Sequence, residues 1–166
     1  MSGDGLVSAV HTHRRTNNPD TDEAMNEILS SSLSALGYGV VGTVVMLLGY
    51  LITDLLTPGK LHQLIWEDRN PNAILLVSAN TLGAAVVVVS AIMSSYSELG
   101  LVPGLVSTAV FGLIGLVVMA LSFLLIDLLT PTKISHIVSN AEWHPATWVS
   151  ATAHLSIALV VAAAIS

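Results

Sequence analysis

Two aspartates at the ends of long apolar runs are the first candidates for chemistry. Asp54 is the only charged residue between positions 33 and 56, and Asp127 is the only one between positions 106 and 129. A charge at the centre of a membrane costs about 2.5–3.5 kcal/mol, and less near the edge. The pair predicts an acidic site for a proton, a metal ion or an amine at one membrane face. In the alternative interpretation, each carboxylate caps a turn or pairs with the lysine six residues later.

Two further polar side chains lie deeper in the apolar sequence. Asn80 and His154 each follow a proline by a stretch that spans about 12 Å along a helix. Polar groups at that depth face the interior of a helix bundle. They predict a polar site or a proton relay in which His154 is the titrating member. The alternative is hydrogen bonding between helices, worth about 0.6–2 kcal/mol.

The elements that position these side chains are predicted to be membrane-spanning helices. Of the 166 residues, 53% are hydrophobic and 10% are charged, and the mean hydropathy is +0.78. A soluble domain carries about 25% charged residues, so the composition excludes a disordered chain, a nucleic-acid-binding protein and an ordinary soluble enzyme. Each apolar run has about the 20 residues that a helix needs to cross a bilayer. The four runs are 33–56, 73–93, 106–129 and 146–165.

An internal repeat relates the two halves of the chain. Residues 39–60 and 112–133 are identical at 13 of 22 positions, including an Asp-Leu-Leu-Thr-Pro-x-Lys segment in each half. Two spans per unit return the chain to its starting side, so both units insert in the same orientation. The sequence therefore predicts an all-α integral membrane protein, with four transmembrane helices as two parallel, same-orientation helical-hairpin repeats. Duplication for packing alone is the alternative.

The repeat sets the predicted boundaries and the predicted structural residues. The two repeats cover 32–95 and 105–166, after a polar arm at 1–31 that is partly disordered and carries a short helix from Asp20. The predicted structural turn residues are Thr57, Pro58, Lys60, Thr130, Pro131 and Lys133. Glycines let helices approach closely and predict packing, within the chain or in a homo-oligomer. They are Gly39, Gly42, Gly49, Gly112 and Gly115.

The repeated Asp-Leu-Leu-Thr-Pro-x-Lys segment carries a resemblance to a known family, together with Arg69-Asn70-Pro71-Asn72 and Asn80-Thr81-Leu82-Gly83. Residues 33–166 resemble the bacterial family called domain of unknown function 350, or uncharacterised protein family 0719. The resemblance implies a small inner-membrane protein of tandem helical hairpins and implies no particular activity. The second repeat departs from the pattern, since His154 stands where the first has Asn80.

These features predict a multi-pass protein of the bacterial cytoplasmic (inner) membrane. Basic residues favour a cytoplasmic position for the loops at 57–72 and 130–145. The predicted function is an ion, proton or small-cation channel or transporter module, with Asp54, Asp127, Asn80 and His154 along its path. The alternative is a non-transporting scaffold or envelope-stress partner that binds a cytoplasmic protein at these loops. The sequence predicts no enzyme activity, no cofactor, no metal site and no nucleic-acid partner.

Overall fold

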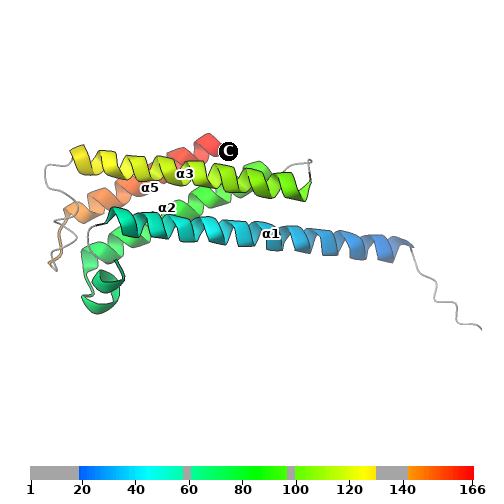
Figure 1. The fold of residues 1–166 in the computed structure, drawn as a ribbon, viewed down its shortest axis with the longest axis horizontal. Helices are drawn as coiled ribbons and strands as arrows, with labels where there is room; N and C mark the ends of the chain where they lie inside the picture. The colour runs from blue at the N-terminus through cyan, green and yellow to red at the C-terminus, as the bar shows by residue number, and fades with distance from the viewer. Residues whose placement is uncertain (1–18, 58–60, 97–99, 130–141) are drawn as a thin grey trace, which may run out of the picture. The chain divides into compact units, whose positions relative to one another are not determined.

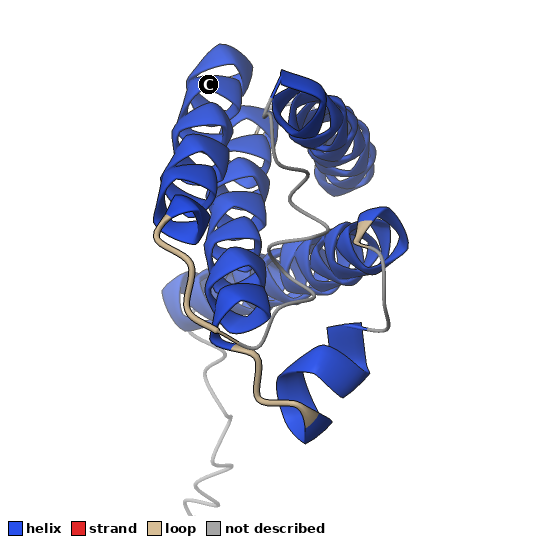
Figure 2. Ribbon diagram, turned by 90° about the vertical axis from the view of Figure 1, so that its left-hand side faces the viewer, coloured by secondary structure: helices blue, strands red, loops and turns tan. Residues whose placement is uncertain are grey.

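The described part of the chain is helical. The computed structural model describes residues 19–57, 61–96, 100–129 and 142–166, and all secondary structure in these ranges is helix (Figures 1 and 2). Four helices are long and apolar enough to cross a membrane, which agrees with the predicted all-α class and the predicted number of spans. They are α1 (Pro19–Leu56), α2 (Pro71–Ser95), α3 (Leu101–Leu129) and α5 (Ala146–Ile165).

Several predicted features lie outside the described residues. These are the disordered segment 1–18 and the turn residues Pro58, Lys60, Thr130, Pro131 and Lys133. By its contacts the chain divides into two compact units, Met1–Leu33 and Ser34–Ser166. In the first unit the described residues belong to α1, which begins at Pro19 and has Asp20 and Asp22 in its first turn. Acidic side chains there interact favourably with the positive end of the helix dipole.

The segment before α2 departs from the predicted loop. Residues 61–67 are helical and include the short π-helix η1 (Gln63–Glu67). Arg69 then adopts a left-handed backbone conformation, with φ of 48°, which reverses the chain direction at some cost in strain. Asn70 caps α2, because its side-chain oxygen accepts hydrogen bonds from the backbone N–H groups of Asn72 and Ala73. Pro71 occupies the first turn, where its missing N–H is no loss.

The third span begins earlier than its apolar run. The sequence places Pro103 and Gly104 in a loop, whereas α3 begins at Leu101 and contains both in its first turn. Proline is tolerated there because the first N–H groups of a helix have no partner within the helix. Gly104 is required by a close approach. A β-carbon at this position would stand 2.9 Å from the carbonyl oxygen of Ser95 and still closer to the Tyr38 hydroxyl.

The core of the second unit is built around α2, whose most extensive contacts are with α5, followed by α3. Hydrogen bonds join both ends of this pair. Asn72 and Thr147 are bonded where the two helices begin, and Ser90 lies 3.2 Å from Ser166 where they end. Val87 packs with residues of α3 and α5 in one apolar cluster. The outward-facing side chains are mostly large and apolar, which suits contact with lipid.

Candidate functional site

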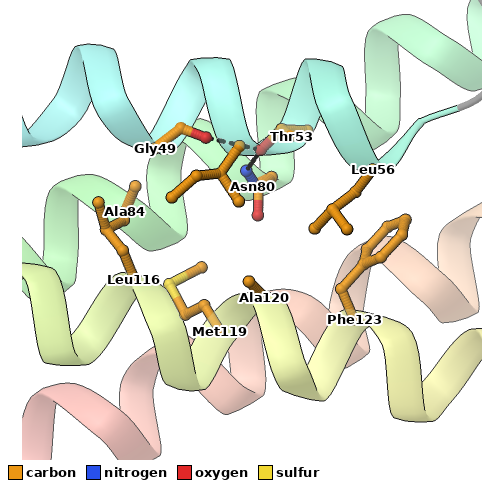
Figure 3. A pocket seen from close by; sticks show the side chains of 10 residues that line it. Gly49, Thr53, Leu56, Asn80, Ala84, Leu116, Met119, Ala120 and Phe123 are labelled. Atoms are coloured by element: carbon orange, nitrogen blue, oxygen red, sulfur yellow. Dashed lines mark hydrogen bonds between the residues drawn. The ribbon is translucent and has the colours of Figure 1, made fainter.

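A small cavity in the second unit lies between α1, α2 and α3 and holds a polar pair (Figure 3). Asn80 from α2 donates a hydrogen bond to the hydroxyl of Thr53 on α1. Thr53 in turn donates to the carbonyl oxygen of Gly49, at 2.9 Å. The free volume is about 20 Å³, enough for about one water molecule. The rest of the wall is largely apolar and includes Leu116, Met119 and Phe123.

His154 lies beside this cavity rather than in its wall. The side chain is buried, with 4% of the residue exposed. Its imidazole stacks on Phe123, a cavity-lining residue, with the ring centroids 4.9 Å apart. The Nε2 atom is buried and has no hydrogen-bond partner in the part of the chain that the structure describes. Buried polar groups are nearly always hydrogen-bonded, and in the described ranges this nitrogen shares the lack of a partner with the Ser95 and Thr108 hydroxyls.

A second polar cluster fastens the beginnings of α2 and α5. Asn72 is fully buried, and its Nδ2 donates to the carbonyl oxygen of Glu142 at 2.7 Å. Its Oδ1 accepts from the His144 backbone N–H at 3.0 Å and from the Thr147 hydroxyl at 2.8 Å. We call Asn72 with these three partners the asparagine clasp. The asparagine clasp holds the first turn of α5, and the residues just before it, against the first turn of α2.

Asp54 lies in the last turn of α1 and bonds to the described segment that begins at Leu61. It is half-buried and accepts a hydrogen bond from the backbone N–H of Leu61 at 3.1 Å. Just beyond it, the buried Thr57 donates its hydroxyl hydrogen to the carbonyl oxygen of Thr53 at 2.9 Å. The bond from Leu61 satisfies a backbone N–H at the start of a helical segment, as a capping side chain does. The Thr53 carbonyl also accepts the Thr57 backbone N–H, at 3.0 Å.

This contact leads to a prediction for two substitutions at Asp54. Asp54→Ala removes the acceptor for the Leu61 N–H and lowers the free energy of unfolding by about 0.5–2 kcal/mol, the usual cost of losing a cap. Asp54→Asn keeps a side-chain oxygen in the same place and costs less than the alanine variant. Unfolding in mixed micelles, followed by tryptophan fluorescence, measures both. Equal losses in the two variants would contradict the capping role.

The four predicted pathway residues do not gather around one cavity. Asn80 lines the cavity, and His154 reaches its wall through Phe123. Asp54 and Asp127 are both half-buried and neither lines it. Sequence reasoning did not single out Thr53, although its hydroxyl is the partner of Asn80. The repeat gives no signal for it, since Ile126 occupies the corresponding position.

The predicted packing glycines have different surroundings. A β-carbon at Gly115 would stand 2.3 Å from Val87 Cγ1, and one at Gly112 would stand 3.0 Å from Val45 Cγ1. At Gly49 and Gly42 the nearest atoms would be 3.0 and 3.2 Å away, on Leu116 and Val88. A β-carbon at Gly39 would meet no atom within 4 Å beyond its chain neighbours and the adjacent backbone of its own helix. Gly39 therefore makes no such approach within the described residues.

Aromatic and ionisable side chains mark the membrane face where α2 and α5 begin. Trp143 and Trp148 stack edge to face, with centroids 6.1 Å apart, and Trp66 lies on η1. All three are exposed, as tryptophans at a membrane interface are. No three His, Asp or Glu side chains in the described ranges stand where they could hold a metal ion.

Comparison with known proteins places the chain in a family. The family model described as Domain of Unknown Function (DUF350) matches residues 27–165. The chain belongs to this family. Membership agrees with the resemblance carried by the repeated Asp-Leu-Leu-Thr-Pro-x-Lys segment. The matched range includes all four apolar helices from residue 27 onward, with Asn80, His154 and the asparagine clasp.

Curated relatives of the DUF350 family come from mycobacteria. A UPF0719 transmembrane protein of Mycolicibacterium paratuberculosis is 39% identical over 142 residues, which are 86% of this chain and 93% of the relative. Proteins of the same description from Mycobacterium bovis and Mycobacterium tuberculosis are each 32% identical over 143 residues, with the same coverage. No solved structure matches the chain.

Proposed function

We propose that this DUF350 protein moves a proton or a small cation across the bacterial cytoplasmic membrane. The observation that carries the proposal is His154, a buried imidazole whose Nε2 has no hydrogen-bond partner in the described ranges. An ionisable group within a membrane span is costly and marks a functional site by default. Neutral imidazole also offers a lone pair that accepts a proton.

The polar pair in the cavity that Phe123 lines supports the same function. Asn80 and Thr53 bring an amide and a hydroxyl to a cavity between otherwise apolar helices. The carbonyl, hydroxyl and imidazole groups offer uncharged ligands to a hydrated cation or a proton. Asp54 and Asp127 stand at the ends of α1 and α3, where their negative charge raises the local concentration of cations.

In the proposal, the internal repeat determines how the helices of the transport module are arranged. The hairpins α1–α2 and α3–α5 form two units of the same orientation, with Asn80 and His154 at equivalent places. The hydrogen bonds at both ends of the α2–α5 pair support this arrangement. Four helices enclose little space, so we expect a homo-oligomer, with the loops at 57–72 and 130–145 in the cytoplasm.

Flux through the purified protein in liposomes tests the proposal, with dyes sensitive to pH and to cations. We expect His154→Gln to reduce flux at least tenfold, a barrier change of about 1.4 kcal/mol, because glutamine cannot carry the proton. The double variant Asp54→Asn with Asp127→Asn is expected to lower flux while leaving assembly unchanged. Ser156→Ala, on the exposed side of the same helix, is the matched control.

Folded wild-type protein that moves none of the tested ions would contradict transport. The protein would then be better described as a scaffold, and substitutions in the two cytoplasmic loops would become the relevant experiment. Flux that is equal in wild type and in His154→Gln would contradict the role of the imidazole.

A further inference from the structure

We infer that His154 is reached from one side only, along polar side chains that lead in from the membrane face where α2 and α5 begin. This inference rests on the proposed function and assigns a direction to its central group. The inference comes from the buried face of α5, whose residues differ in polarity before and after His154. Before His154 this face buries Thr147 and Ser150 together with Ala151, and the buried residues of α5 after His154 are all apolar.

The polar half consists of three side chains on α5. Thr147, Ser150 and His154 recur at intervals of three and four residues, which places them within about 60° of arc on one helix face. All three are buried between helices rather than exposed to lipid. Thr147 belongs to the asparagine clasp, so the series begins at the membrane face and reaches His154 about 10 Å farther along the helix.

The apolar half closes the same face beyond His154. The next buried residues on α5 are Ala158, Val161 and Ala162. Ala158 and Val161 pack with Val87 and Met119 in one cluster. Gly83 draws α2 close to α5 at this level, because a β-carbon there would stand 2.9 Å from Ala158 Cβ. The partly buried Ile157 and Ile165 pack against the same cluster.

The polar half and the apolar half of this face differ in whether they admit a hydrated ion. Hydroxyl groups stabilise water and cations that enter between helices, whereas a tightly packed apolar cluster excludes them. The arrangement is therefore a half-path that ends at His154, closed on the opposite side. Exchange with that side requires the apolar cluster to open, which is the behaviour of a transporter that alternates rather than of a continuous pore.

Cysteine accessibility tests this direction, and the chain has no native cysteine to remove. Four single variants in liposomes are treated with a cationic methanethiosulfonate reagent that does not cross the bilayer. Ser150→Cys probes the polar half, Ala158→Cys probes the apolar cluster, and Thr152→Cys faces away from the bundle near the depth of Ser150. His144→Cys, which is exposed, identifies the side where α5 begins. Mass spectrometry measures the rate of modification.

We expect Ser150→Cys to react about tenfold or more faster than the other two buried or lipid-facing variants, because a thiol needs water to ionise and react. The reaction should occur only from the side that modifies His144→Cys. Modification from the other side, no modification at all, or equal rates at Ser150→Cys and Thr152→Cys would overturn the inference. Rapid modification of Ala158→Cys would replace the half-path by a continuous pore.

The cysteine-labelling experiment and the flux experiment can each contradict one proposal without contradicting the other. If labelling is one-sided and the wild type moves no tested ion, the half-path stands and the transport proposal fails. If flux depends on His154 but Ser150→Cys is inert, the proposed function stands and this route is wrong.

Discussion

Replacing Asn72 by alanine is expected to lower the free energy of unfolding by about 1–3 kcal/mol, because buried hydrogen-bonding groups lose their partner. Asn72 is fully buried, and its amide makes three hydrogen bonds to the chain around the start of α5. Alanine leaves the Glu142 carbonyl, the His144 N–H and the Thr147 hydroxyl without it. Titration of the protein in mixed micelles measures the effect, and Trp143 and Trp148 report fluorescence beside the clasp.

A second substitution separates the clasp from a general loss of stability. Thr147→Val removes one of the three bonds, and the double variant with Asn72→Ala should cost less than the sum of the single variants. The expected coupling is about 0.5–3 kcal/mol. Thr152→Val is the control, since its hydroxyl bonds only to carbonyls of its own helix. Additive losses from Asn72 and Thr147 would show that the clasp does not act as a unit.

Gly115→Ala is expected to destabilise the bundle by about 1–3 kcal/mol, the cost of overpacking a tight core. The new β-carbon would stand 2.3 Å from Val87 Cγ1 and 3.3 Å from Ile165 Cδ1. Valine has few rotamers within a helix, so Val87 relieves the clash only if α2 and α3 move apart. Titration with a denaturing detergent measures the loss.

Gly39→Ala provides the opposite control on a second helix. No atom lies within 4 Å of its added β-carbon, and alanine favours a helix over glycine by about 0.5–1 kcal/mol. We expect this variant to be as stable as the wild type or slightly more so. The double variant Gly115→Ala with Val87→Ala should lose less stability than the sum of the two single variants, because alanine at position 87 removes the clashing methyl group. Additive losses would place the cost somewhere other than the Gly115–Val87 contact.

The number of long apolar helices followed from the sequence because a membrane imposes them locally. A backbone in lipid must satisfy its hydrogen bonds within each segment, so an apolar run of about 20 residues forms a helix whatever its neighbours are. The contacts of Asp54 and Thr57 are local in the same way, since both bond to backbone groups only a few residues away. The family was also recognisable from its local repeated segment.

The tertiary structure decided which polar groups meet, because these contacts join residues far apart in the chain. Asn80 reaches Thr53 on α1, which the repeat does not mark, and Asn72 reaches residues 70 to 75 positions later. The sequence of an apolar helix gives little information about which side faces a neighbouring helix, since lipid and a neighbouring helix are both apolar surroundings. The sequence thus identified Asn80, His154 and the packing glycines as candidates. Only the packing of the helices against one another determined which glycines touch a neighbour and left the buried imidazole beside Phe123.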